Sequence, residues 1–373
     1  MKAWILNSIG DIELEEIPVP KLHEGEVLIK VHAAGVCGSD IPRIYRDGAH
    51  VMPLVLGHEF AGEIAEVHES VSGRVAEITG NGKNMAAGVF PLIPCNECEP
   101  CRVRKYQMCR NYNYLGSRCN GGFAEYVAVP ADRLIILPDK VTYEQAAMLE
   151  PMGVAVHAMR KIMPADKNAK IAVCGLGTIG LLLSMFLIDA GYDNIYLIGN
   201  KDSQKRAAIS LGIPADRYCD SKSCNVREWL FERTGNGADA FYECVGRADT
   251  ANQAVECAAP GGSVLFVGNP AGDMEFPKAT YWKILRNELT VKGTWNSSYY
   301  GAFDRECAVA DMGTANRPKG DDYDYIISRF SAGTIHPEKF ITHRFGIEDL
   351  DKGLLVMRDK TEEYIKIMME MFN

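Results

Sequence analysis

The sequence predicts an α/β fold in which a β-rich domain is joined to a doubly wound domain built on a parallel sheet. Up to about residue 145 the chain consists of short β-type runs punctuated by Gly and Pro, and beyond that point strands alternate with helices. A glycine-rich turn at residues 175–180 lies between a predicted strand and a predicted helix. At 373 residues the chain is long enough for two domains with separate cores.

The first part of the chain favours strands. Residues 12–20, 26–35, 62–67 and 123–130 either alternate polar with apolar side chains or are rich in β-forming residues. The Gly and Pro residues between these runs indicate turns. We therefore expect a mostly β-sheet domain over residues 1–147.

In the middle of the chain, helices alternate with short apolar strands. The expected helices cover residues 144–163, 179–190 and 203–211, and the expected strands cover residues 170–174, 194–198, 240–244 and 263–267. This alternation indicates βαβ units around a parallel sheet, which we place at residues 148–290. Residues 291–373 are expected to return to the first domain and to end in a helix rich in Met and Lys.

Composition limits the partners and the location. The net charge is −9 and Lys and Arg form no dense run, so nucleic acid and anionic membranes are not expected partners, because both attract clustered positive charge. The chain holds no apolar run near the ~18 residues that a membrane helix needs. Its first residues turn acidic before a signal-peptide core could form, so we expect a cytoplasmic protein. In that compartment, clustered cysteines indicate metal binding more often than disulfides.

Four thiols lie within one short polar segment, at Cys95, Cys98, Cys101 and Cys109. Zn²⁺ favours tetrahedral thiolate coordination, and short loops can wrap four sulfurs around one ion. Because four sulfurs close the coordination shell, this zinc is expected to be structural. The alternatives are a chance cluster of buried cysteines and a [4Fe–4S] cluster, whose cysteine spacings are comparable.

The turn Gly175-Leu-Gly177-Thr178-Ile179-Gly180 follows a predicted strand and opens a predicted helix. In a Rossmann domain the first glycine allows the tight turn, the second lets the backbone approach a pyrophosphate, and the third lets helix and strand pack closely. The helix N-terminus offers free N–H groups to the phosphates. We expect a dinucleotide to bind here; the alternative is a glycine turn in a sheet that binds no ligand.

The end of the next strand bears on the choice between NAD and NADP. An Asp or Glu about twenty residues after the glycines would bind the ribose 2′-OH of NAD. Gly199 offers no carboxylate here, whereas Asn200 and Lys201 can donate to a 2′-phosphate, and Lys205 and Arg206 add positive charge. This pattern favours NADP over NAD. The alternative is that these residues are solvated on a helix surface and that both cofactors are accepted.

Three further motifs offer metal ligands: CGSD at residues 37–40, GHE at residues 57–59 and LEP at residues 149–151. Each is weak by itself, since a lone His is more often structural and a Glu before Pro commonly lies at a turn. Together they supply one thiolate, one imidazole and one or two carboxylates. That donor set suits a zinc site with an open position.

The order of these motifs, with GGFAEY at residues 121–126, resembles the zinc-containing medium-chain dehydrogenase/reductase family over nearly the whole chain. The similarity is greatest to the polyol branch and to its galactitol-1-phosphate 5-dehydrogenase subgroup, through residues 37–62, 115–126 and 283–296. It implies a GroES-like catalytic domain, a Rossmann cofactor domain, and hydride transfer between a secondary hydroxyl of a polyol or polyol phosphate and a nicotinamide cofactor. The alternative activities are an NADP-dependent secondary alcohol dehydrogenase and an unphosphorylated sorbitol- or xylitol-type dehydrogenase.

The resemblance also implies roles for individual residues. Cys37, His58 and Glu150 are expected to bind a catalytic zinc, with Glu59 as a neighbouring or exchanging ligand. Ser39 is placed to relay the proton of the substrate hydroxyl, and the alternative is a turn serine. The residues expected to line the substrate site are Tyr45, Arg118, Trp295 and Asn296, each of which could instead be a surface or packing residue.

A phosphate on the substrate would need cationic partners. The candidates are Arg43, Arg46 and Arg118, because a guanidinium matches phosphate bidentately. The alternative is that they are solvated surface arginines, which is the favoured interpretation for Arg46. The sequence departs from the subgroup at Gly199, where an acidic residue and NAD are usual, and at residues 307–322, which resemble an insertion. Members of the family are usually dimers or tetramers, so a homodimer or homotetramer is expected.

Three rival interpretations stay open. They are a zinc ribbon that binds nucleic acid, a zinc-independent reductase of the same fold, and a catalytically silent relative. The net negative charge opposes the first, and the intact ligand set opposes the other two. Cysteines outside the metal motifs, Cys219 and Cys224 among them, are expected to be small buried residues or free thiols.

Overall fold

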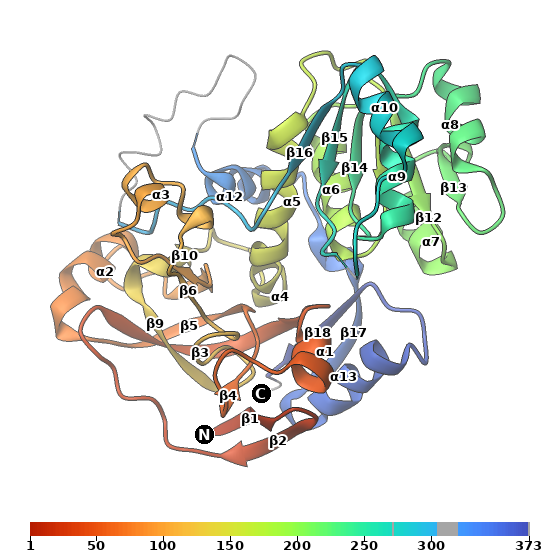
Figure 1. The fold of residues 1–373 in the computed structure, drawn as a ribbon. Helices are drawn as coiled ribbons and strands as arrows, with labels where there is room; N and C mark the ends of the chain where they lie inside the picture. The colour runs from red at the N-terminus through yellow and green to blue at the C-terminus, as the bar shows by residue number, and fades with distance from the viewer. Residues whose placement is uncertain (271, 304–319, 372–373) are drawn as a thin grey trace. The chain divides into compact units, whose positions relative to one another are not determined.

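The computed structural model describes residues 1–270, 272–303 and 320–371, and the chain divides into two compact units (Figure 1). Unit 1 consists of Met1–Gly153 with Ser297–Asn373, and unit 2 of Val154–Asn296. Most of the expected insertion at residues 307–322 lies outside the described residues. None of the helices in the described ranges combines the length and the hydropathy that a membrane crossing requires.

Unit 1 is built on a mixed sheet. Its strands are β3 (Glu26–Val36), β5 (Glu59–Val67), β6 (Ala86–Val89), β9 (Tyr126–Pro130), β10 (Leu134–Ile136), β17 (Ile341–Gly346) and β18 (Lys366–Glu370). They run in the order β10-β6-β5-β3-β18-β17, and β9 also pairs with β3. The remaining strands of the unit are β1 (Lys2–Ser8), β2 (Asp11–Glu16), β4 (Leu54–Val55), β7 (Leu92–Ile93) and β8 (Asn113–Tyr114).

Short helices connect these strands. They are α1 (Asp40–Pro42), α2 (Ser72–Ile78), α3 (Glu99–Arg102), α4 (Tyr143–Ala147), α12 (Asp322–Ala332) and α13 (Leu350–Asp359). Helix α5 (Leu149–Ile162) begins in unit 1 and continues into unit 2. The capping box of Thr142 and Gln145 begins α4, because each side chain accepts a hydrogen bond from the backbone N–H of the other.

The central strand of unit 1 is β3, which pairs antiparallel with both β5 and β18. Gly35 lies opposite Glu59 of β5, and Val36 lies opposite Ile367 of β18. Because neighbours cover both of its edges, β3 is buried along most of its length, and Val27 joins the hydrophobic core. The end of β3 is therefore a fixed point between two strands that are far apart in the sequence.

The prediction that the chain ends in a helix is wrong. The segment rich in Met and Lys forms β18, parallel to β17 and antiparallel to β3. Met368 and Met369 are both fully buried. A short apolar run does not distinguish a strand buried on both faces from a buried helix, and here the sheet position decides.

Unit 2 carries a parallel sheet in the order β13-β12-β11-β14-β15-β16. Its strands are β11 (Ile171–Cys174), β12 (Ile195–Gly199), β13 (Tyr218–Asp220), β14 (Ala238–Glu243), β15 (Ala258–Phe266) and β16 (Thr290–Gly293). The connecting helices are α6 (Thr178–Asp189), α7 (Asp202–Ser210), α8 (Val226–Thr234), α9 (Ala248–Cys257) and α10 (Lys278–Arg286). The predicted doubly wound fold is confirmed.

The sequence does not predict the two edge strands of this sheet, because β13 has only three residues and β16 is exposed throughout. Beside β13, Cys219 and Cys224 form a disulfide, which corrects the expectation that they are free. The backbone N–H groups of Ser223 and Cys224 donate to Asp220 O at 3.0 and 3.1 Å, so a tight turn brings the two cysteines together.

Candidate active site

Cys37 lies directly after β3, in a turn that also carries Ser39 and Asp40. The backbone N–H of Cys37 donates to Asp40 Oδ2 at 3.0 Å, and the backbone N–H of Asp40 donates to Cys37 O at 3.0 Å. The Ser39 hydroxyl donates to Cys37 Sγ at 3.3 Å. These contacts hold the thiol at the end of the central strand of unit 1.

His58 and Glu59 stand at the start of β5, and they meet Cys37 because β5 runs antiparallel to β3. Each of the three residues presents one donor atom, and all three atoms lie within 4.8 Å of one another. His58 is 5% exposed and Glu59 is 2% exposed. A thiol, an imidazole and a carboxylate gathered in a buried place are the donor types of a zinc site that keeps a position open, so these residues fit a zinc ion.

Asp40 is a candidate residue to which the sequence analysis gives no role. It is fully buried, its Oδ1 lies 3.5 Å from His58 Nδ1, and it accepts a hydrogen bond from Arg43 Nη1 at 2.9 Å. Burial opposes its ionisation, but the charges of His58 and Arg43 hold the pKa of Asp40 below its usual range. A carboxylate facing one ring nitrogen orients the other toward a metal. Asp40 is the fourth residue of the CGSD motif, and this position was the signal available in the sequence.

Glu150 lies at the start of α5 and is buried, but it is outside the group formed by Cys37, His58 and Glu59. Its Oε1 accepts a hydrogen bond from the Tyr114 hydroxyl at 2.9 Å. Burial and then the charge of Glu150 raise the pKa of Tyr114 well above its usual value, so the hydroxyl keeps its proton and donates. The role of Glu150 as a metal ligand stays a prediction.

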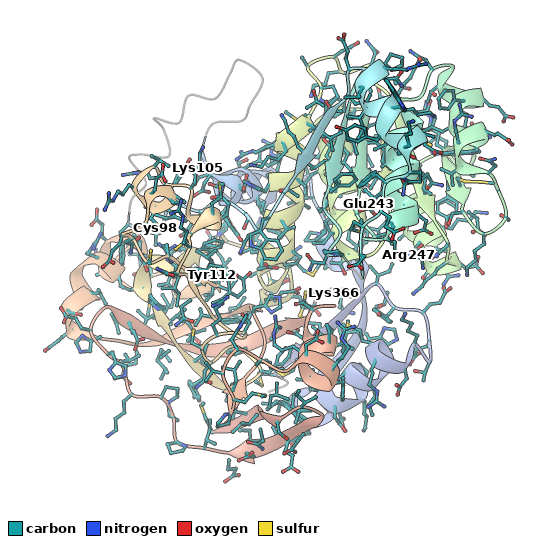
Figure 2. The ribbon with its side chains drawn as sticks, in the orientation of Figure 1. Cys98, Lys105, Tyr112, Glu243, Arg247 and Lys366 are labelled. Atoms are coloured by element: carbon teal, nitrogen blue, oxygen red, sulfur yellow. A yellow bond between two sulfur atoms is a disulfide. The ribbon has the colours of Figure 1, made fainter. Side chains whose placement is uncertain are left out.

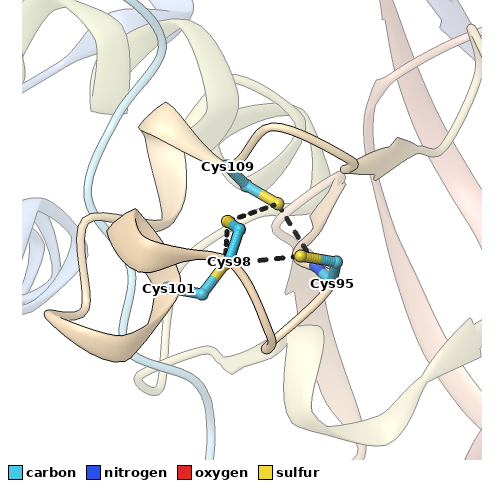
Figure 3. Close-up of side chains that lie close together, drawn as sticks. All are labelled: Cys95, Cys98, Cys101 and Cys109. Carbon is cyan, nitrogen blue, oxygen red and sulfur yellow. Dashed lines mark hydrogen bonds between the residues drawn. The ribbon is translucent and has the colours of Figure 1, made fainter.

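The four remaining predicted ligands form a second, separate group (Figure 3). The sulfur of Cys98 lies 3.4 Å from that of Cys101 and 3.9 Å from that of Cys109, and the backbone N–H of Cys95 donates to Cys109 Sγ at 3.3 Å. A hydrogen bond from the backbone N–H of Arg110 lowers the pKa of Cys98 to about 6, which favours the thiolate. Four converging sulfurs fit a tetrahedral zinc ion.

The residues expected to line the substrate site are divided between the units. Tyr45 lies on the π-helical turn Arg43–Asp47 in unit 1, and the Arg358 guanidinium covers its ring at 4.7 Å. Arg118, also in unit 1, stacks over Tyr112 at 4.6 Å. Trp295, which is 56% exposed, and Asn296 belong to unit 2.

Arg118 carries a buried donor in unit 1, its Nε, for which the structure shows no hydrogen-bond acceptor among the described residues. The pKa of His50 is lowered, first by burial and then by the positive charges of Arg118 and Arg43. Arg118 and Arg43 therefore both act electrostatically on His50, which the sequence analysis does not single out.

In unit 2 the glycine turn has the strand–turn–helix placement that the sequence predicts. Gly175 has φ +92°, and a Cβ added to Gly180 would lie 2.0 Å from Gly175 O. Both positions therefore require glycine.

At the end of β14, Glu243 Oε1 accepts hydrogen bonds from the backbone N–H groups of Val245 and Gly246 at 2.8 and 2.9 Å (Figure 2). Glu243 thereby holds the loop against which Gly175 packs.

Gly199 ends β12 in a confined space. A Cβ at this position would lie 2.8 Å from Gln204 Oε1 and 2.9 Å from the Tyr218 hydroxyl. Gln204 Oε1 accepts the backbone N–H of Asn200 at 2.9 Å, and the Tyr218 hydroxyl donates to Lys201 O at 3.2 Å. An acidic side chain at residue 199 would have to displace one of these groups.

Comparisons with known proteins identify the family of the chain. The alcohol dehydrogenase GroES-like domain matches residues 23–139, and the zinc-binding dehydrogenase domain matches residues 178–310. Galactitol 1-phosphate 5-dehydrogenase of Escherichia coli (strain K12) is 33% identical over 301 residues, which cover 79% of this chain and 83% of that protein. Sorbitol dehydrogenase of Bacillus subtilis (strain 168) is 28% identical and covers 99% of this chain and 96% of its own length. The crystal structure of galactitol-1-phosphate dehydrogenase from Escherichia coli has a TM-score of 0.84 at 28% identity, and the match covers 99% of this chain and 100% of that chain.

Proposed function

The chain belongs to the zinc-binding medium-chain alcohol and polyol dehydrogenases, and on this premise we propose that it oxidises a secondary hydroxyl of a phosphorylated polyol, with NADP as the preferred hydride acceptor. One observation carries the proposal: the mixed group of half-buried Cys37 with buried His58 and Glu59 is separate from the four-cysteine group. Four sulfurs close a zinc shell, whereas the mixed group leaves room for a substrate oxygen. The cytoplasmic location stays a prediction.

The side chains around the mixed group suggest how the reaction proceeds. Zinc at this site would lower the pKa of the substrate hydroxyl and so prepare its carbon to release hydride to the nicotinamide. Cys37 and His58, with Glu150 as predicted, would hold the metal, with Glu59 beside it as a neighbouring or exchanging ligand, and Asp40 would keep the His58 ring in place. The Ser39 hydroxyl, beside Cys37 Sγ, would take the proton of the substrate hydroxyl while giving its own proton to water.

Metal analysis separates the roles of the two groups. The wild-type protein should contain two zinc ions per chain, and Cys37→Ser and Cys101→Ser should each contain one. Cys37→Ser should fold normally and lose activity by about a thousandfold or more, because a metal Lewis acid supplies several kcal/mol. Cys101→Ser should instead lower the melting temperature, because a structural zinc stabilises the fold. Cys119→Ser, at a free cysteine, is the control and should keep both ions. Full activity of metal-free protein would contradict the assignment.

The preference for NADP rests on the end of β12. Gly199 provides no carboxylate to repel a 2′-phosphate, and Gln204 and Tyr218 occupy the space that an acidic side chain would need. Asn200 and Lys201 follow directly and can donate to a phosphate. The N-terminus of α6, at Thr178 and Ile179 after the glycine turn, is proposed to bind the pyrophosphate.

Cofactor kinetics test this preference. Lys201→Ala should raise KM for NADP by about tenfold and leave that for NAD unchanged, since a charge-assisted hydrogen bond contributes about 1.5–3 kcal/mol. Gly199→Asp combined with Tyr218→Phe, which removes the crowding hydroxyl, should shift the preference toward NAD. Lys278→Ala, on exposed α10, is the matched lysine control. Equal kcat/KM for both cofactors in every variant would refute the proposal.

A phosphorylated substrate would give Arg118 a partner. Its buried Nε has no hydrogen-bond partner among the described residues, whereas Arg43 is already paired with Asp40. A dianionic phosphate would accept from Arg118 and match its guanidinium. The relative at 33% identity acts, by its name, on a polyol phosphate, which favours the same substrate class.

Paired substrates distinguish this proposal from its alternatives. Arg118→Ala should raise KM for galactitol 1-phosphate by about tenfold or more, by loss of a charge-assisted hydrogen bond, and leave that for galactitol unchanged. Arg46→Ala removes a surface arginine paired with Asp47, so it should change neither value. Activity confined to free polyols or simple secondary alcohols would keep the family and reject the phosphate.

We also propose that the protein is a homodimer through β16. This strand ends the sheet of unit 2 with an exposed edge, and Val291 on it and Trp282 and Leu285 on α10 are exposed apolar residues. An open edge with apolar neighbours favours pairing with a second copy by two-fold symmetry.

Light scattering tests the homodimer. It should give twice 41.1 kDa for the wild type and 41.1 kDa for the double variant Val291→Lys/Leu285→Glu. Ile209→Glu, at an exposed position of α7, should stay dimeric, and a monomeric wild type would refute the proposal.

A further inference from the structure

Lys366 is a buried cation to which the proposed reaction assigns no role. It is 1% exposed, and its Nζ forms an ion pair with Glu59 Oε2 and donates to Val36 O at 2.9 Å (Figure 2). Lysine is almost never fully buried unless it is paired. Its partner belongs to the mixed metal-ligand group, so Lys366 acts directly on that group.

The sheet positions both members of this pair. Glu59 begins β5 and Lys366 begins β18, and these strands flank β3 on opposite sides. Their side chains meet over Gly35, where an added Cβ would lie 2.3 Å from Glu59 Oε2 and 2.7 Å from Lys366 Cε. The absence of a side chain at Gly35 therefore leaves the space that the ion pair fills.

The charges of the site explain why a cation is needed. Cys37, Glu59 and Glu150 supply three anionic groups when ionised, and one divalent zinc balances only two of them. Asp40 already has Arg43 as its partner. Lys366 provides the remaining positive charge, which matters because an unbalanced charge is costly in a buried site.

We propose that Lys366 is a positioning residue that holds the Glu59 carboxylate and limits its competition with substrate for the metal. This inference rests on the proposed zinc site. With the ammonium in place, Glu59 Oε2 is fixed toward β18 and its charge is shared. Without the Lys366 ammonium, the Glu59 carboxylate would turn toward the metal ion.

The test is a double-mutant cycle on the metal itself. Lys366→Met removes the charge and keeps the length of the side chain. In protein carrying Co²⁺ at the mixed site, Lys366→Met should weaken the visible absorption bands of the ion, as expected when the Glu59 carboxylate becomes an additional ligand. It should also slow metal release to a chelator by about tenfold, which is the scale of outer-shell effects. In a Glu59→Gln background, Lys366→Met should change the release rate less than twofold. Lys170→Met, which removes a lysine bonded to Thr234 O, is the control and should have no effect in either background.

Each other outcome has a defined meaning. Equal effects of Lys366→Met in both backgrounds would overturn the inference, because Lys366 would then not act through Glu59. If Lys366→Met alone does not fold, Glu59→Gln/Lys366→Met should fold and bind Co²⁺, since it removes both buried charges; failure of the double variant would overturn the pairing. A wild type without Co²⁺ bands from the Cys37 thiolate would contradict the proposed zinc site itself, whereas normal wild-type bands without coupling would reject only the role of Lys366.

Discussion

Pairing of β3 with β5 on one side and β18 on the other is the constraint on which the mixed metal-ligand group depends. It brings Cys37, at the end of β3, beside Glu59 at the start of β5 and adds Lys366 from the last strand of the chain. Local turns alone would not hold these groups together, because all of unit 2 lies between β3 and β18 in the sequence. Folding of the C-terminal segment onto unit 1 is thus part of building the site.

The proposed binding sites of the two units offer different kinds of groups. Unit 1 gathers side-chain donors, sulfur atoms in one group and mixed donors in the other, and surrounds the mixed group with paired charges such as Asp40 and Arg43. Unit 2 offers mainly backbone, through the glycine turn at the start of α6 and the loop that Glu243 holds. Metal coordination needs several side chains at fixed positions, whereas a pyrophosphate needs free N–H groups and the absence of side chains.

The arrangements that the sequence anticipates are those with short spacing. The four cysteines lie within one loop and the glycines within one turn, so their spacing carries the information, and alternation of strands and helices is enough for the fold of unit 2. The sequence analysis gave no role to Lys366 or Asp40, and it was wrong about β18 and about the Cys219–Cys224 disulfide. All four features depend on tertiary contacts. Lys366 and Glu59 are 307 residues apart, and only the sheet order brings them together. The position of Glu150 relative to a metal stays a prediction for the same reason.

The central claim is that the protein holds two different zinc ions, one of them at the mixed site. Crystals of protein purified without added metal, measured on both sides of the zinc absorption edge, test it most directly. The account predicts two anomalous peaks per chain, one among Cys95, Cys98, Cys101 and Cys109 and one beside Cys37 and His58. A peak among the four cysteines alone, in protein that is fully active, would contradict it.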